Sequence, residues 1–114
     1  MKTIESIFPA YSVAGGDKNF ETIAYKGSNF LGVQIFYTSF SKGDNKIRLQ
    51  ESIDGAQYVD SKDANGNYIE IILATANASD MIKVDDFHAE YVRARFIEGT
   101  SGTGTISKIN FLME

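Results

Sequence analysis

The chain has 114 residues, 43% of them hydrophobic, which is enough for one domain, residues 1–114, with one buried core. It has no cysteine, which excludes disulfides, thiolate zinc sites and cysteine nucleophiles. Its net charge of −4 and the absence of a Lys/Arg run argue against nucleic acid as a partner, because phosphate neutralisation dominates that binding. No window approaches the ~20 apolar residues of a membrane span, so we expect a soluble, cytoplasmic protein unless an assembly carries it out.

Polar and apolar residues alternate with a period of two along most of the chain, which predicts β-strands. In chain order, the predicted strands cover residues 12–14, 22–26, 30–40, 46–50, 56–59, 67–74, 81–84, 90–96 and 103–113. A change of phase between Ile106 and Ile109 predicts a β-bulge in the last strand. Residues 74–80 are the one helix candidate, and a short one.

Turn-forming residues separate these strands. Glycine, asparagine and aspartate gather at residues 15–17, 27–29, 42–45, 54–55, 65–67 and 99–104. Strands followed by turns at intervals of about 8–12 residues are typical of sandwiches and barrels. The sequence therefore predicts an all-β fold, a two-sheet antiparallel β-sandwich.

No group of residues has the pattern of a catalytic site. His88 is the single histidine, and no Gly-x-Ser-x-Gly elbow supplies a nucleophile for it. The carboxylate pairs 85–86 and 51/54 are expected to be solvated surface charges. The glycine-rich residues 99–104 lead into a strand, whereas a phosphate loop opens a helix, so we expect a hairpin connection there. We expect no enzyme activity and no cofactor.

A polar loop at residues 61–66 has some features of a calcium loop. Its first position is Ser61, and Ile72 stands where an EF-hand needs a bidentate glutamate, so EF-hand geometry is excluded. Two interpretations stay open: a polar hairpin loop, or a calcium site of another kind that uses Asp60, Asp63 and Asn65.

Three tyrosines are candidate binding residues. Tyr58, Tyr68 and Tyr91 fall near turns or on the polar phase of a strand, where an exposed ring can anchor a protein partner or stack on a sugar. Each can equally fill the core or a sheet edge, as most aromatic residues of a sandwich must.

Two segments carry a resemblance to a known family. In residues 47–58 a strand leads into Ser52-Ile53-Asp54-Gly55 and then Tyr58, and in residues 87–96 an aromatic-Val-Arg run ends at Arg93. Together they resemble two strands of galactose-binding-like (discoidin-type) jelly rolls. The resemblance implies a jelly-roll sandwich with a turn at Asp54-Gly55. It also implies that Tyr58 packs back across that turn and that Arg93 lies on the polar face of its strand. The sugar-binding loops of the family are not identifiable here.

The size of the domain, the Ser-x-Asp-Gly turn and the Gly-Thr-Gly-Thr-Ile run at residues 102–106 also look like small bacteriophage virion proteins. That resemblance implies a non-enzymatic structural module of the capsid-decoration, head-fibre or tail-adaptor type. Such a module would form a homo-oligomer, bind other protein subunits and be located in the virion after assembly in the host cytoplasm. The alternative is a carbohydrate-binding jelly roll, assisted by calcium.

Overall fold

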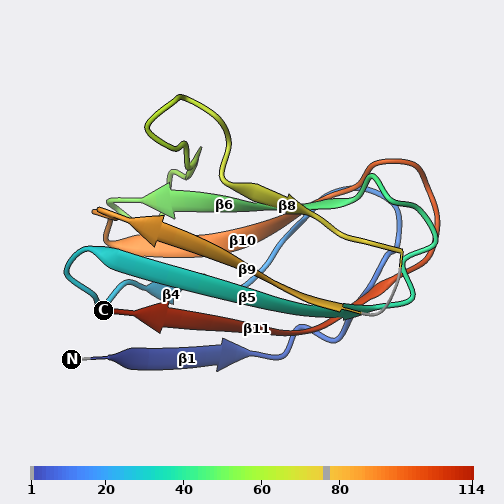
Figure 1. Cartoon of the computed structure of the whole chain (residues 1–114), viewed down its shortest axis with the longest axis horizontal. Helices are drawn as coiled ribbons and strands as arrows, with labels where there is room; N and C mark the ends of the chain where they lie inside the picture. Colours follow the sequence, from blue (N-terminus) through green and yellow to red (C-terminus); the bar gives the residue numbers. More distant parts are fainter. Residues whose placement is uncertain (1, 76–77) are drawn as a thin grey trace.

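The computed structural model describes residues 2–75 and 78–114, which form two antiparallel β-sheets packed face to face (Figure 1). The five-stranded sheet has the order β1-β11-β5-β9, with β2 also paired to β11. Its strands are β1 (Thr3–Ile7), β2 (Tyr11–Ser12), β5 (Phe30–Thr38), β9 (Ala78–Asp85) and β11 (Thr105–Met113).

The six-stranded sheet has the order β3-β10-β6-β7, with β4 paired to β10 and β8 paired to β6. Its strands are β3 (Lys18–Asn19), β4 (Ile23–Ala24), β6 (Lys46–Ser52), β7 (Val59–Asp60), β8 (Glu70–Ile72) and β10 (Tyr91–Ile97). The long strands alternate between the sheets, since β5, β9 and β11 lie in one and β6 and β10 in the other. This alternation is the jelly-roll connection, so the predicted fold class is confirmed.

The period-two pattern of the sequence places the core between the sheets. Val92, Ala94 and Phe96 of β10 are buried, and so is the phase of β5 that runs from Leu31 to Tyr37. Burying each such large side chain contributes about 1.5–3 kcal/mol. The two sheets are therefore held together mainly by these inward-facing residues. The side chains of the opposite phase face away from the core.

Most predicted strands are found, and several are shorter than predicted. The strand predicted at residues 67–74 is paired to β6 only over Glu70–Ile72, and Tyr68 forms one isolated bridge to Lys62. The predicted bulge is confirmed by a register shift between Ile106 and Lys108. Strands β1 and β3 were not predicted.

The helix predicted at residues 74–80 is wrong where the structure describes it. Residues 78–80 are the first part of β9 and pair with residues 35–37 of β5. The local helix preference of this alanine-containing stretch is weak, and pairing with a long central strand outweighs it. Residues 76–77 lie outside the described residues. Within the described ranges, the structure contains no helix long and apolar enough to cross a membrane.

Candidate functional site

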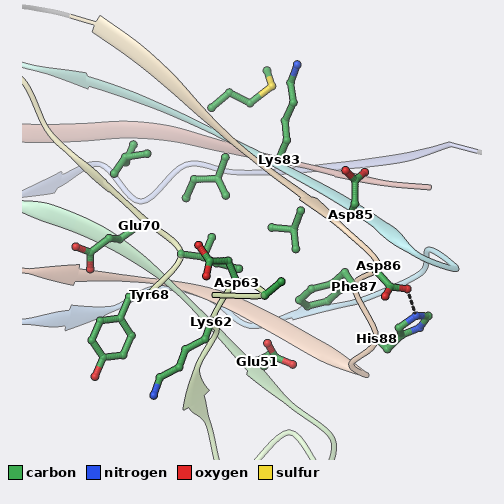
Figure 2. Close-up of a pocket in the computed structure, with 16 residues that line it drawn as sticks. Glu51, Lys62, Asp63, Tyr68, Glu70, Lys83, Asp85, Asp86, Phe87 and His88 are labelled. Atoms are coloured by element: carbon green, nitrogen blue, oxygen red, sulfur yellow. Dashed lines mark hydrogen bonds and ion pairs between the residues drawn. The ribbon is translucent and has the colours of Figure 1, made fainter. Parts of the chain in front are cut away.

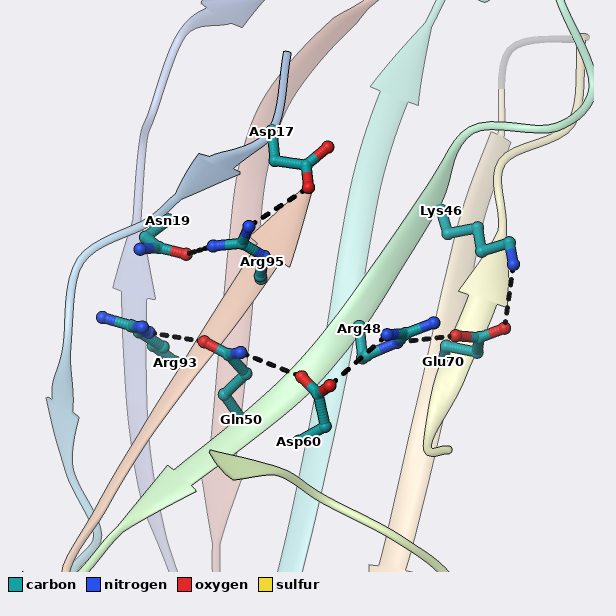
Figure 3. Close-up of polar contacts among 9 residues, drawn as sticks. All are labelled: Asp17, Asn19, Lys46, Arg48, Gln50, Asp60, Glu70, Arg93 and Arg95. Atoms are coloured by element: carbon teal, nitrogen blue, oxygen red, sulfur yellow. Dashed lines mark hydrogen bonds and ion pairs between the residues drawn. The ribbon is translucent and has the colours of Figure 1, made fainter. Parts of the chain in front are cut away.

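The outer face of the six-stranded sheet carries a continuous polar ladder (Figure 3). Arg93 donates from Nε to Oε1 of Gln50 at 2.8 Å, and Gln50 donates from Nε2 to Oδ1 of Asp60 at 2.9 Å. Arg48 follows, with Nη1 3.4 Å from Oδ2 of Asp60 and Nε 2.9 Å from Oε1 of Glu70. The ladder crosses β10, β6, β7 and β8, so it ties the strands of this sheet together from outside.

Two tyrosines stack on the arginines of this ladder. The guanidinium carbon of Arg93 lies 3.9 Å from the ring centroid of Tyr58, and that of Arg48 lies 3.9 Å from the ring centroid of Tyr68. Burial alone would lower the pKa of Arg48, but the hydrogen bond and negative charge of Glu70 outweigh it, and the pKa is raised. Arg48 therefore stays charged in this setting. Each of the two cation–π contacts adds about 0.5–1 kcal/mol.

The predicted turn at Asp54-Gly55 is present, with a different ring against it. Asp54 Oδ1 accepts hydrogen bonds from the backbone N–H groups of Gln57 and Ala56 at 2.9 Å, and these bonds lower its pKa. A Cβ added at Gly55 would lie 3.1 Å from the ring of Tyr91. Tyr58 instead reaches Thr22, with the two hydroxyl oxygens 2.8 Å apart.

The four predicted binding residues thus share one outer face. There they contact one another, the ladder or the turn at Gly55, instead of pointing freely into solvent. Arg93 and Tyr58 contact each other, Tyr68 stacks on Arg48, and Tyr91 covers the turn. The polar side-chain groups of Arg93 and Tyr58 have partners within the chain. Because the ladder residues also bond one another, this face is self-contained.

The calcium candidates have separate partners. Asp60 belongs to the polar ladder. Asp63 Oδ1 accepts from the backbone N–H groups of Asn65 and Asn67 at 2.9 and 3.0 Å, which closes the loop on itself. Across residues 2–75 and 78–114, no three His, Asp or Glu side chains converge as metal ligands. Calcium-assisted binding stays a prediction.

A groove opens between the two sheets where β9 runs beside the loop at residues 62–69 (Figure 2). Its volume is about 680 Å³. Ile82 and Phe87 contribute buried apolar surface, whereas Lys83 and Asp85 are exposed at its rim. His88 also lines it, and its Nε2 lies 2.9 Å from Oδ1 of Asp86.

That pair does not make a catalytic arrangement. Both side chains are largely exposed, and no hydroxyl of the described residues lies within hydrogen-bonding distance of the imidazole. A nucleophile–base pair requires such a contact. Within residues 2–75 and 78–114, His88 therefore has Asp86 as its hydrogen-bonding partner and no hydroxyl nucleophile beside it.

The glycine-rich loop at residues 99–104 already holds an internal carboxylate. Asp44 Oδ2 accepts a 2.8 Å hydrogen bond from the backbone N–H of Thr100 and a second from its hydroxyl, and both bonds lower the pKa of Asp44. The Oγ of Ser41 accepts a hydrogen bond from the backbone N–H of Thr103 at 2.8 Å. The backbone donors of Thr100 and Thr103 are thus engaged by the facing loop. The predicted hairpin is wrong, because this loop connects β10 of one sheet to β11 of the other and the two strands do not pair.

The outer face of the five-stranded sheet, called the apolar face below, exposes several large apolar side chains beside Lys83, Lys108 and uncharged polar residues. It was not predicted from the sequence. It carries Ile4, 67% exposed, and Met81, 51% exposed, from its two edge strands. Phe8, 70% exposed, lies just beyond β1. On β5 every side chain of this face is uncharged: Phe30, Gln34, Phe36 and Thr38, with Gly32 among them. The available signal was the phase of β5 opposite to the core, which contains two phenylalanines.

A hollow lies at the centre of this apolar face. Gly32 has no side chain, and the hollow above it has a volume of about 220 Å³. Its apolar lining residues are Ile4, Phe30, Met81 and Leu112, and its polar ones are Gln34, Lys83 and Asn110. A Cβ at Gly32 would lie 3.5 Å from the ring of Phe30 and 3.6 Å from Leu112, which are ordinary contacts. The hollow is thus room left open on the surface, and a partner side chain of moderate size fits into it.

No family model and no curated protein matches the chain. Among solved structures it is similar to a family two carbohydrate esterase from Cellvibrio japonicus, at 13% identity and a TM-score of 0.45, covering 100% of this chain and 35% of that one. It is also similar to a structure of infectious bursal disease virus, Gx strain, at 10% identity and a TM-score of 0.45, covering 98% and 33%. The chain spans about a third of the length of each.

Likenesses this distant give no basis for an activity or a partner. The jelly-roll sandwich rests on the strand order of the chain itself. The galactose-binding-like family stays a prediction.

Proposed function

We propose that the chain is a non-enzymatic structural module that binds other protein subunits through the outer face of its five-stranded sheet. The observation that supports this most is the contrast between the two outer faces. One carries a ladder of paired charges and exposes Ile72 at β8. The other exposes Ile4, Phe8 and Met81 beside an uncharged phase of β5, and its lysines, Lys83 and Lys108, lie on the flanking strands. Depletion of charge and enrichment in Phe, Met and aliphatic residues is the composition of an interface centre. Contiguous apolar patches of this kind mark contact sites.

The finer form of the proposal is a bacteriophage virion subunit of the decoration, head-fibre or tail-adaptor type. A small sandwich with a self-contained polar face and an apolar face suits a repeated subunit, because one side meets water while the other meets a neighbour. Assembly in the host cytoplasm and final location in the virion belong to the same proposal.

The test is incorporation into particles. Mass spectrometry of virus particles banded from the culture that encodes the chain is expected to find it at a fixed ratio to the other structural proteins. Phe36→Asp and Ile4→Asp place a charge on the apolar face and are expected to abolish incorporation. Ile53→Asp, at a 71% exposed position in the loop after β6, is the matched control and is expected to incorporate normally. Recovery of the unaltered chain only from the particle-free fraction contradicts the proposal.

The groove favours a second candidate, carbohydrate binding. Tyr68 is 46% exposed and lines the groove with Lys62, Asp63 and Asp85, which combines an aromatic ring with polar groups that can bond hydroxyls. A glycan array is the direct test. A hit lost in Tyr68→Ala, and strengthened by calcium only if Asp63 is intact, supports this candidate. An array without hits removes it.

A further inference from the structure

The pairing register arranges the apolar face in three rows across the sheet. Asn110 pairs with Ser6 on one side and Gln34 on the other, and Gln34 pairs with Met81, so these four form the middle row. Two residues further toward the C-terminus of β11 lies a second row, which consists of Ile4, Leu112, Gly32 and Lys83. Two residues toward the N-terminus of β11 from the middle row lies a third row, which consists of Phe8, Lys108, Phe36 and Ser79.

The two outer rows are complementary to each other. A two-fold rotation about an axis along the middle row exchanges them and leaves each strand over its own copy. The Phe36 ring of one copy then faces the hollow at Gly32 of the other, and Ile4 faces Phe8. Neither Lys83 nor Lys108 meets a lysine, because Lys83 faces Ser79 and Lys108 faces Leu112. The middle row meets itself through Met81 and through amide and hydroxyl groups that can bond in pairs.

From this we infer that the partner covering the apolar face is a second copy of the chain, in a symmetric face-to-face dimer. The inference rests on the proposed function, since it names the subunit that the face binds. The area is compatible with it: β11, β5 and β9 pair over eight residues and β1 over five. At about 3.4 Å per residue and about 4.8 Å per strand, this face covers about 470 Å² per copy. The total of about 950 Å² lies close to the roughly 1,000 Å² expected of a specific interface, at the low end of the size range. Sheets stacked face to face in this way pack well when roughly aligned.

Gly32→Val is expected to weaken the dimer without destabilising the folded monomer. A Cβ added at Gly32 meets only ordinary contacts within the chain, and valine suits a central strand better than glycine. It also fills the hollow that receives Phe36. Sedimentation equilibrium is expected to find the unaltered chain at twice the monomer mass. The dissociation constant of the Gly32→Val dimer is expected to be more than about tenfold higher than that of the unaltered dimer. The melting temperature measured on dilute monomer stays equal or rises. Gly43→Val, whose Cβ lies 3.8 Å from Thr75, is the control and is expected to dimerise normally.

Single cysteines test the axis directly, because the chain has none of its own. Met81→Cys lies on the axis and is expected to cross-link to itself with a short bis-maleimide. Lys83→Cys and Ser79→Cys are expected to cross-link to each other when mixed, and far less to themselves. Val59→Cys, 64% exposed on the other sheet, is expected to give no dimer.

The outcomes distinguish this inference from the proposed function. A chain that stays monomeric at all concentrations and cross-links no better at Met81→Cys than at Val59→Cys overturns the dimer. If Phe36→Asp still abolishes incorporation into particles in that case, the proposed function stands and another protein covers the face. A dimer whose Phe36→Asp variant incorporates normally supports the inference and overturns the proposed role of the face.

Discussion

Replacing Gly104 by alanine is expected to destabilise the chain through one clash. A Cβ at Gly104 would lie 2.5 Å from the ring of Phe40, well inside ordinary van der Waals contact. That ring is 1% exposed and is held between Tyr37 and Phe96, with centroids 5.8 and 6.1 Å away, so it has no free direction in which to move. Overpacking of this kind costs about 1–3 kcal/mol. For a domain of this size each kcal/mol corresponds to about 3–6 °C in Tm.

Chemical and thermal unfolding followed by circular dichroism measure this cost. Gly43→Ala is the control, since its Cβ lies 3.8 Å from Thr75, and its free energy of unfolding is expected to change by less than about 0.5 kcal/mol. Adding Phe40→Leu to Gly104→Ala is expected to recover part of the loss, giving a coupling free energy above about 0.5 kcal/mol. Equal stabilities of Gly104→Ala and Gly43→Ala would refute the reasoning that close packing, and not flexibility, selects glycine in this loop.

Four further substitutions test the polar contacts, each by denaturant unfolding. Arg48→Ala removes the centre of the polar ladder and is expected to cost about 1–2 kcal/mol, whereas Lys46→Ala, whose ammonium lies 3.6 Å from its acidic partner, costs less than about 0.5 kcal/mol. Tyr37→Phe deprives the Asp80 carboxylate of its hydroxyl donor and is expected to cost about 1–2 kcal/mol. The pKa of Asp54 is lowered in the folded state, so its stabilising effect is complete above the ordinary value of 3.8 and is lost as pH falls through the folded pKa. The stability difference between Asp54→Ala and the unaltered chain is therefore expected to vanish in strong acid. A difference that grows on acidification, or full stability of Arg48→Ala or Tyr37→Phe, contradicts the corresponding contact.

The sequence was sufficient for the fold because the core obeys one simple rule. Alternation of the kind seen at Val92, Ala94 and Phe96 is dictated by strand geometry, and it identifies both the strands and their buried phase. The same rule failed at residues 78–80, where the strand is set by pairing to distant residues 35–37. It also missed short edge strands, whose few residues give too little pattern.

The candidate sites were harder to predict for the same reason. Tyr58 and Arg93 are 35 positions apart, and their stacking depends on how β7 and β10 flank β6. The apolar face was visible in part, because Phe30 and Phe36 share the phase opposite to Leu31. Its extent needs Ile4, Met81 and Leu112, which only the strand order β1-β11-β5-β9 brings beside them.

The most direct test of the contact face is a concentration series of backbone amide NMR spectra of the unaltered chain. We predict that the shifts changing with concentration gather on β1, β5, β9 and β11, centred on Gly32, Gln34 and Phe36, while the amides of β6 and β10 stay fixed. Changes that gather instead on β6 and β10, around Arg48 and Arg93, would contradict the assignment of the apolar face as the surface that binds protein.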